Sequence, residues 1–272
     1  MTGLSKGDFE VLDNARPQQI THFAEEGASP LTVALLIDTS SSALDILDDE
    51  KESARRFFTE MLAPADRAIL VGFGRRVFVW QDLTSSSVDL NSAITHVRPL
   101  ESDDPKAGTL LYDAAYMVAR AKLKGLNGRK VIVILSDGLD NGGAFGQKDA
   151  IRAAQDADAV IFGIHKLDAG QFNFQRPVDG TLNAEITGWA KSLGMATLKK
   201  LSLSTGGRVF DVDGKQPLEE IFAMIRDETH HEYGLGFAAP PAESGGQYHR
   251  LEVRCHRQGV KVRARTGYYG SP

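Results

Sequence analysis

Disulfide bonds, membrane-spanning segments and an excess of basic charge are all missing from this sequence. Its 272 residues include one cysteine, Cys255, which excludes a framework of intrachain disulfides. No apolar run approaches the ~18–20 residues that cross a bilayer. The net charge is −5, so the overall composition does not suggest a nucleic-acid partner. The cysteine usage fits a reducing compartment, and it fits equally a secreted bacterial domain that needs no disulfides.

A leader and the familiar catalytic motifs are also absent. Residues 1–6 lack the apolar core of a signal peptide, and strand-like sequence follows at once, as expected of a piece trimmed from a longer protein. The pair Gly72 and Gly74 lacks the third glycine of a dinucleotide-binding loop, and no Gly-x-Ser-x-Gly or Walker A sequence occurs. The composition, 42% hydrophobic and 25% charged, is ordinary for a soluble globular protein.

Strand-like and helix-like segments alternate through the middle of the chain. Segments with helical spacing of apolar residues lie between short apolar runs, which indicate buried strands at 31–38, 68–73, 77–80, 130–135 and 159–165. The connection that begins at Gly74 is so short that the strands on either side of it must form a hairpin. We therefore predict an α/β fold with a Rossmann-like, doubly wound, mostly parallel six-stranded sheet flanked by helices.

The two ends of the chain are rich in strand-like sequence. Strand-like sequence occurs at 9–12, 19–24, 233–237, 250–256 and 260–266, and in the last two of these segments apolar residues alternate with charged ones. The simplest arrangement is that these segments meet in one small sheet. We thus predict two units, an α/β domain at 30–228 and a small β module formed by 5–26 together with 230–270.

Polar residues follow the first buried strand of the predicted α/β domain. The strand ends in Asp38, and Ser40 and Ser42 come next. Binding sites of open α/β sheets lie at the carboxyl ends of the strands. Tracing strand directions through the hairpin brings Thr109 and Asp137 to the same edge. Carboxylate and hydroxyl oxygens are the hard ligands that Mg²⁺ and Mn²⁺ prefer, so the sequence predicts a metal site there.

Each of these residues also has a simpler interpretation. The acid and serines after the first strand could cap the next helix, and Thr109 could be an N-cap as well. Asp137 could belong to an ordinary turn with Gly138. Asp140 and Asn141, a few residues further on, are interpreted as turn residues. The alternative is that they hold the metal ligands in position without touching the ion themselves.

Taken together, the five residues resemble the metal-ion-dependent adhesion site of the von Willebrand factor type A domain. That family has Asp-x-Ser-x-Ser after the first strand, a threonine in a later loop and an aspartate after the fourth strand. Here the pattern is Asp38-Thr-Ser40-Ser-Ser42, then Thr109 in Gly-Thr-Leu-Leu-Tyr-Asp, then Asp137 in Leu-Ser-Asp-Gly. The resemblance runs over most of the predicted α/β domain and implies its fold.

The resemblance also implies a role for each residue. Ser40 and Ser42 would ligate Mg²⁺ directly, and Thr109 would do so directly or through water. Asp38 and Asp137 would balance the charge, often through waters. Mn²⁺ or Ca²⁺ could replace Mg²⁺. One coordination position would stay open for an Asp or Glu carboxylate offered by a protein partner.

A narrower resemblance concerns bacterial von Willebrand factor A-related proteins of acidobacteria. It is carried by the segment around Leu12, by Thr205-Gly-Gly-Arg and by the ending that reaches Tyr268. Such proteins are typically exported and of undefined ligand, which implies a periplasmic or secreted location. Ser41 and Ala43 depart from the family pattern, where glycine and methionine are common, without removing a ligating oxygen.

An insertion at 166–183 follows a strand that should end at the metal side. Its Phe172, Phe174 and Arg176 suit contact with a partner beside the ion, and the alternative is a plain surface loop.

Three functions remain open at this point. The first is a non-enzymatic, metal-dependent protein-binding module of the adhesion type. The second is a scaffold with a structural or vestigial metal site. The third is a phosphohydrolase with Asp38 as nucleophile, which is disfavoured because Ser40 stands where such enzymes carry a second aspartate.

Overall fold

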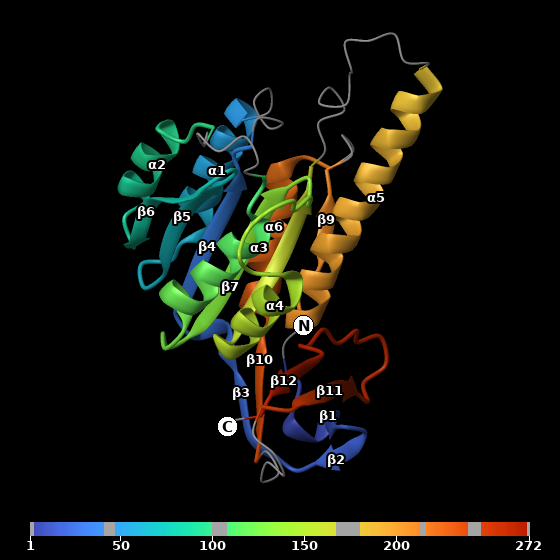
Figure 1. Cartoon of the computed structure of the whole chain (residues 1–272). Helices are drawn as coiled ribbons and strands as arrows, with labels where there is room; N and C mark the ends of the chain where they lie inside the picture. Colours follow the sequence, from blue (N-terminus) through green and yellow to red (C-terminus); the bar gives the residue numbers. More distant parts are fainter. Residues whose placement is uncertain are drawn as a thin grey trace.

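The structure is a computed structural model of the whole chain. It describes residues 3–40, 47–99, 108–166, 180–212, 216–238 and 246–270. Figure 1 shows a large α/β part and, below it, a smaller part that contains both ends of the chain.

A six-stranded sheet forms the centre of the α/β part. Its strand order is β6-β5-β4-β7-β8-β9. All neighbours are parallel except β5 and β6, which form the predicted hairpin. The strands are β4 (Leu31–Asp38), β5 (Arg67–Phe73), β6 (Val77–Thr84), β7 (Arg129–Ser136), β8 (Ala159–His165) and β9 (Val209–Asp211). The predicted fold class is confirmed.

The central strands are continuous apolar runs because both faces of the sheet are covered. All eight residues of β4 and all eight of β7 are buried. Alternate side chains point to opposite faces, so Val33, Leu35 and Ile37 join one core cluster while Ala34 and Leu36 join the other.

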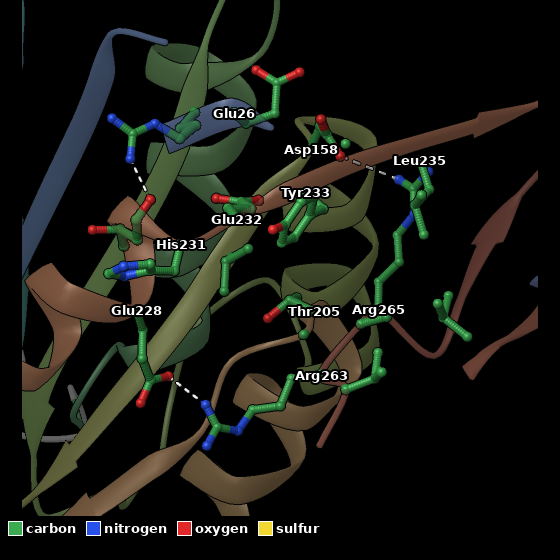
Figure 2. Close-up of a pocket in the computed structure, with 18 of the residues that line it drawn as sticks. Glu26, Asp158, Thr205, Glu228, His231, Glu232, Tyr233, Leu235, Arg263 and Arg265 are labelled. Atoms are coloured by element: carbon green, nitrogen blue, oxygen red, sulfur yellow. Dashed lines mark hydrogen bonds and ion pairs between the residues drawn. The ribbon is translucent and has the colours of Figure 1, made fainter. Parts of the chain in front are cut away.

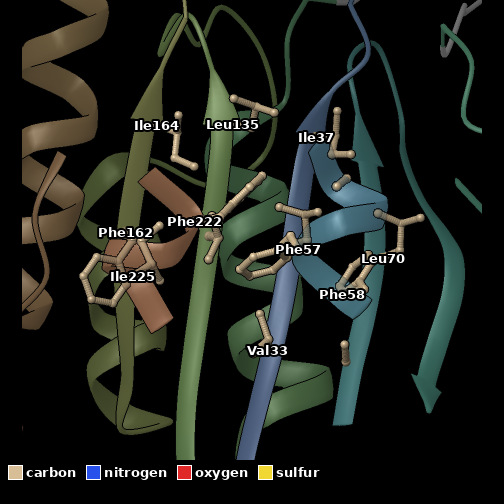
Figure 3. Close-up of a cluster of buried hydrophobic side chains, with 14 of the residues drawn as sticks. Val33, Ile37, Phe57, Phe58, Leu70, Leu135, Phe162, Ile164, Phe222 and Ile225 are labelled. Atoms are coloured by element: carbon tan, nitrogen blue, oxygen red, sulfur yellow. The ribbon is translucent and has the colours of Figure 1, made fainter. Parts of the chain in front are cut away.

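Three helices cover the first face: α1 (Leu47–Met61), α2 (Ser87–Thr95) and α6 (Leu218–His230). Figure 3 shows Phe57 of α1 next to Phe222 of α6 over the strands, with Phe58 beside Leu70 and Ile225 beside Phe162. The rings of Phe57 and Phe222 have centroids 4.2 Å apart. Aromatic packing thus ties the first and last helices of the domain to the same strands.

The second face is covered by α3 (Leu111–Met117), the π-helix η4 (Val118–Leu123), α4 (Gln147–Asp156) and α5 (Gly180–Thr205). Two helix starts differ from the sequence-based expectation. α3 begins at Leu111 instead of Thr109, whose backbone is held in a loop contact. α5 begins at Gly180, inside the segment that we expected to be an insertion. None of the helices in the described residues combines the length and the apolar character needed to cross a membrane.

The chain ends form two sheets where one was expected. β1 (Phe9–Asp13), β2 (Arg16–Gln18), β11 (Tyr248–Cys255) and β12 (Gly267–Tyr269) make a four-stranded sheet in the order β12-β11-β1-β2. β3 (Ile20–Glu25) pairs instead with β10 (Tyr233–Phe237). The short helices η1 (Lys6–Asp8) and η2 (Glu26–Ala28) precede and follow these strands. Whether the ranges 5–26 and 230–270 act as a separate module stays a prediction.

The strand predicted at 260–266 is wrong. Val260, Val262 and Ala264 do alternate with charged residues, but they line a cavity next to the α/β part instead of pairing with a strand. The bridge between Thr205 and Arg265 is isolated. The charged residues between them, Lys261 and Arg263, line the same cavity, so the alternation here does not mark a strand with one buried face.

That cavity, of about 860 Å³, lies between the lower ends of β7 and β8, the end of α6 and the four-stranded sheet. Figure 2 shows Glu232 and Tyr233 inside it, with Arg263 and Arg265 reaching toward Glu228 and Asp158. The cavity is at the amino-terminal end of the strands, opposite the edge where the metal site is predicted.

Candidate metal centre at the carboxyl edge of the sheet

Asp38 lies at the carboxyl end of β4, as predicted. β4 pairs with β7 in register, with Ile37 opposite Leu135, so Asp38 falls beside Ser136 and Asp137 follows directly. Of the five predicted ligands, Ser42 lies outside the described residues. The other four are described, and the contacts below show how the loops that carry them meet.

The Asp38 carboxylate is buried and held by neutral donors. Its Oδ1 accepts a hydrogen bond from the backbone N–H of Ser40 at 3.0 Å, and its Oδ2 accepts one from Ser136 Oγ at 2.7 Å. Burial raises the pKa of Asp38, while the hydrogen bonds from Ser40 and Ser136 act in the opposite direction. Within the described part of the chain, no basic side chain compensates this charge.

Ser136 is a residue of the site that sequence reasoning missed. Its Oγ donates to Asp38 and accepts from the backbone N–H of Gly138 at 2.9 Å, so it links two of the loops. A signal was available in the sequence. Ser136 follows Ile132 and Ile134 at intervals of two, so it lies on the same face of the sheet as they do. Asp38 follows Leu36 at the same interval and lies on that face too.

Gly74, in the hairpin, connects the Ser40 loop to the Thr109 loop. A Cβ at Gly74 would stand 3.1 Å from the backbone N of Ser40 and the O of Thr39, which is tighter than ordinary contact. The carbonyl of Gly74 accepts a hydrogen bond from the N–H of Leu110 at 3.0 Å. The absence of a side chain thus lets the hairpin bring the residue after Thr109 next to Ser40.

Asn141 fixes the backbone of Thr109. The Thr109 N–H donates to Asn141 Oδ1, and the Asn141 N–H donates to the Thr109 carbonyl at 3.2 Å. Gly108 lies so close that a Cβ there would collide with the Asn141 side chain. Both backbone groups of Thr109 are therefore used by a residue 32 positions away. Asn141 supports the threonine loop, which corresponds to the less favoured of its two sequence interpretations.

Asp140 and Asp113 hold the neighbouring backbone in a similar way. Asp140 Oδ1 accepts from the N–H of Tyr112, in the first turn of α3, at 3.0 Å. Asp113 Oδ1 accepts from the N–H of Ala144 at 3.0 Å. Burial raises the pKa of Asp140, and the nearby negative charge of Asp113 adds to the shift. Asp140 is thus a structural acid behind the threonine loop, close to a second acid.

Asp137 begins a turn that is packed against α5. Its Oδ1 accepts from the N–H of Leu139 at 2.9 Å. Gly138 has φ of +78°, and side chains at Gly138 or Gly194 would each collide with the backbone of the other loop or helix. Only glycine suits both positions, so α5 fixes the turn that carries Asp137.

One further polar group lies along the same edge. His165, at the end of β8, is fully buried, and its Nδ1 is 2.9 Å from Asp211 Oδ1. Lys191 of α5 approaches Asp211 Oδ2 at 2.9 Å. Burial acts to raise the pKa of Asp211, but the hydrogen bonds from His165 and Lys191 outweigh it and lower that pKa.

The donor set suits a hard divalent cation. Carboxylate and hydroxyl side chains lie on neighbouring loops at this edge, and the described residues contain no cluster of three or more His, Cys, Asp or Glu side chains that could hold a metal. A softer metal that needs nitrogen or sulfur ligands has no such set here. The residues that we predicted to contact a partner, Phe172, Phe174 and Arg176, lie outside the described residues.

Comparisons with known proteins agree with this fold. A sequence model of the von Willebrand factor type A domain matches residues 33–140, the stretch from β4 to the turn after β7. The chain therefore contains a von Willebrand factor type A domain. A comparison with curated proteins found no significant match.

Solved structures show the same fold at low sequence identity. An aerotolerance-related membrane protein from Bacteroides fragilis is 16% identical with a TM-score of 0.55, over 74% of this chain and all of that chain. BatB from Bacteroides thetaiotaomicron is 16% identical with a TM-score of 0.53, over the same shares. Proximal thread matrix protein 1 from the mussel byssus, with a zinc-occupied metal-ion-dependent adhesion site, is 16% identical with a TM-score of 0.53, over 79% of this chain and 49% of that chain.

Proposed function

We propose that this protein is a non-enzymatic, Mg²⁺-dependent protein-binding module of the adhesion type. Asp38, Ser40, Ser42, Thr109 and Asp137 would hold the ion. The ion, when bound, supplies an electropositive position that can accept an Asp or Glu carboxylate of a protein partner. Mn²⁺ or Ca²⁺ is an alternative occupant.

The observation that carries this proposal is the unbalanced acidity of the edge. Asp38, Asp113 and Asp140 accept hydrogen bonds from N–H and hydroxyl groups, and within the described residues none of them has an ion pair with a basic side chain. A buried carboxylate without a cationic partner is costly, and Asp38 is buried. A bound cation would relieve that cost, and the hydroxyls beside the carboxylates would complete its coordination.

The relative with a zinc-occupied adhesion site supports the assignment to a divalent metal. Its likeness to this chain is in the fold, so the choice of Mg²⁺ rests on the oxygen-only ligands of this chain. An extracytoplasmic location in a bacterium is part of the proposal. It is supported by the narrower sequence resemblance and by the membrane protein among the structural neighbours.

The phosphohydrolase alternative has weaker support. Asp38 is only 5% exposed, and both of its carboxylate oxygens already accept hydrogen bonds. A nucleophile must be accessible to its substrate, and a side chain this deeply buried is not. The scaffold alternative differs from the main proposal in one respect, because a purely structural metal would not require an open coordination position.

Calorimetric titration with MgCl₂ tests the proposal on the parent protein and on Asp38→Ala and Thr109→Ala. Thr95→Ala, an exposed threonine at the end of α2, is the matched control. We expect binding by the parent and by the control, and loss of binding in the two site variants. The absence of Mg²⁺ binding by the folded parent protein would refute the proposal.

A second measurement separates the adhesion module from the scaffold. Thermal unfolding with and without EDTA shows how far the fold depends on the metal. Stability that changes little on chelation fits a binding site whose open position serves a partner. A collapse of stability on chelation would favour the scaffold. Contact of Phe172, Phe174 and Arg176 with the partner stays part of the proposal.

A further inference from the structure

The outer face of α5 carries an apolar stripe that nothing in the described structure covers. Trp189 is 66% exposed, Leu193 45% and Leu203 46%, whereas the opposite face of the same helix is buried: Ala190 is 1% exposed, and Leu198 and Leu201 join the core cluster formed with β8 and α4. Figure 1 shows α5 at one side of the molecule, with its upper part projecting beyond the ends of the strands. An exposed tryptophan in a row of apolar residues is typical of an interaction surface.

The spacing of this stripe is that of a coiled-coil seam. Its members follow one another at intervals of three, four, three, four and three positions, which keeps them on one side of the helix. They are Ile186, Trp189, Leu193, Ala196, Lys200 and Leu203. The series of intervals is the same whether it is counted from the amino-terminal or from the carboxyl-terminal end of the helix. A second α5 that runs antiparallel therefore meets this one with every layer filled, about a twofold axis near the middle of the stripe.

The side chains are complementary in that arrangement. Leu193 of one copy faces Ala196 of the other, so a large residue meets a small one. Ile186 faces Leu203, and Trp189 faces Lys200, whose ammonium group can lie over the indole ring. A parallel pair would instead place Trp189 against Trp189 and Lys200 against Lys200.

The charges of the helix also favour the antiparallel direction. Glu185 is near the start of α5, while Lys199 and Lys200 are near its end, and none of the three has an ion pair among the described residues. Antiparallel pairing brings the acidic end of one helix toward the basic end of the other, and it aligns the two helix dipoles favourably. Parallel pairing sets like charges side by side.

We infer that the protein forms a symmetric dimer through antiparallel packing of α5 along this stripe. The stripe spans about 26 Å of helix. One helix from each copy buries on the order of 800–1,000 Å² in total, below the size of standard interfaces, so the dimer is weak, with Kd in the micromolar range. Because the turn that carries Asp137 packs against Gly194, near the middle of α5, the proposed metal sites of the two copies would point in opposite directions. Such a dimer could join two binding partners.

Sedimentation velocity tests this over protein concentrations from roughly 1 to 300 µM, a range that brackets the expected Kd. The parent protein should shift from monomer to dimer, and it should do so equally in EDTA, because the stripe contains no metal ligand. Trp189→Glu should stay monomeric throughout. Val88→Glu, which changes a 74%-exposed residue of α2, should dimerise like the parent. A parent protein that is monomeric at every concentration would overturn the inference.

Cross-linking tests the direction of packing. In a Cys255→Ser background, Leu193→Cys and Ala196→Cys are prepared separately and then mixed under oxidising conditions. Antiparallel packing predicts more disulfide-linked dimer in the mixture than in either variant alone. The control Val88→Cys should give little. Preferential linkage of each variant to itself, or equal linkage by Val88→Cys, would contradict the antiparallel dimer.

Discussion

Acidic side chains have different partners at the two ends of the central sheet. At the carboxyl edge, Asp38 and Asp140 are held by backbone N–H and hydroxyl donors. At the amino-terminal end, Glu228 pairs with Arg263 at 2.6 Å and with Arg208, and Asp158 approaches Arg265 at 3.5 Å. Glu228 and Asp158 at the lower end are thus paired with arginines of the chain itself, whereas Asp38 and Asp140 at the upper edge have no basic partner among the described residues and leave negative charge for a cation to balance. We expect changes at the lower end to alter stability and changes at the upper edge to alter metal binding.

The largest effect on stability is expected from Arg129→Met. Arg129 is 6% exposed and donates to the carbonyl of Ser29 at 2.6 and 2.9 Å and to that of Thr229. Its loss leaves two buried carbonyls without a donor and frees the end of α6, so the free energy of unfolding should fall by about 3 kcal/mol. Urea denaturation measures this.

The exposed Arg120→Met is the control and should change stability by less than about 0.5 kcal/mol. Mg²⁺ affinity should be the same in both arginine variants and in the parent. A large loss of Mg²⁺ affinity in folded Arg129→Met would break the division between the two ends of the sheet.

The local sequence pattern was sufficient to predict several features of the carboxyl edge of the sheet. The phase of alternation that buries Ala34 and Leu36 also sets the side on which Asp38 lies, and the short connection at Gly74 requires β6 to reverse direction. Strand direction at this edge follows from such rules, whereas the order of the strands in the sheet was not predicted.

Contacts between distant segments could not be predicted in the same way. Thr109 does not open α3: its carbonyl, which would accept the first hydrogen bond of the helix, accepts instead from the N–H of Asn141, 32 residues away. The alternation at Val260 and Val262 gave no sign that a cavity, instead of a neighbouring strand, lies beside them. Propensity and periodicity describe the surroundings of a residue, and they do not identify the atoms that accept its hydrogen bonds.

The next largest effect is expected at the upper edge, from Asn141→Ala. This change removes the side-chain acceptor for the Thr109 N–H and leaves every proposed ligand in place. Because supporting residues of this kind orient metal ligands, Mg²⁺ affinity should fall by about 10- to 100-fold. The exposed Asn127→Ala, at the opposite end of the sheet, should bind Mg²⁺ like the parent. Calorimetry that finds equal affinity for both variants would show that Asn141 does not position Thr109.

A smaller effect is expected from Tyr268→Phe in the β-rich part. The Tyr268 hydroxyl donates to Asp13 Oδ2 at 2.9 Å, and Asp13 is 2% exposed. Loss of this donor should cost about 1–1.5 kcal/mol at neutral pH, because a buried carboxylate loses one hydrogen bond. Tyr269→Phe, whose hydroxyl makes no hydrogen bond within the described residues, is the matched control.

The pH dependence of the same variant gives a second measurement. Burial, with the hydrogen bond to Asp13, raises the pKa of Tyr268 to about 12, from an ordinary value of 10.0. The folded state therefore favours the protonated phenol. Its contribution is fully present below pH 10 and is lost as the pH rises from 10 to about 12. The stability difference between parent and Tyr268→Phe should narrow in that range and stay constant below it.

The smallest effect, and the only stabilising one, is expected from Glu232→Gln in the cavity of Figure 2. Burial raises the pKa of Glu232, while the charge of Arg129 opposes the shift. The Glu232 carboxylate has no hydrogen bond or ion pair among the described residues, in contrast to Glu228. A raised pKa means that the folded state binds the proton more tightly, so the parent loses stability as the pH rises above the ordinary value of 4.5. Glutamine avoids this loss, and the variant should be slightly more stable than the parent at pH 7 and equal to it at a pH well below 4.5.

Glu228→Gln should change stability in the opposite direction at pH 7, because it gives up two ion pairs. Equal destabilisation of both variants would contradict this prediction. It would show that Glu232, like Glu228, is a compensated acid in the folded protein.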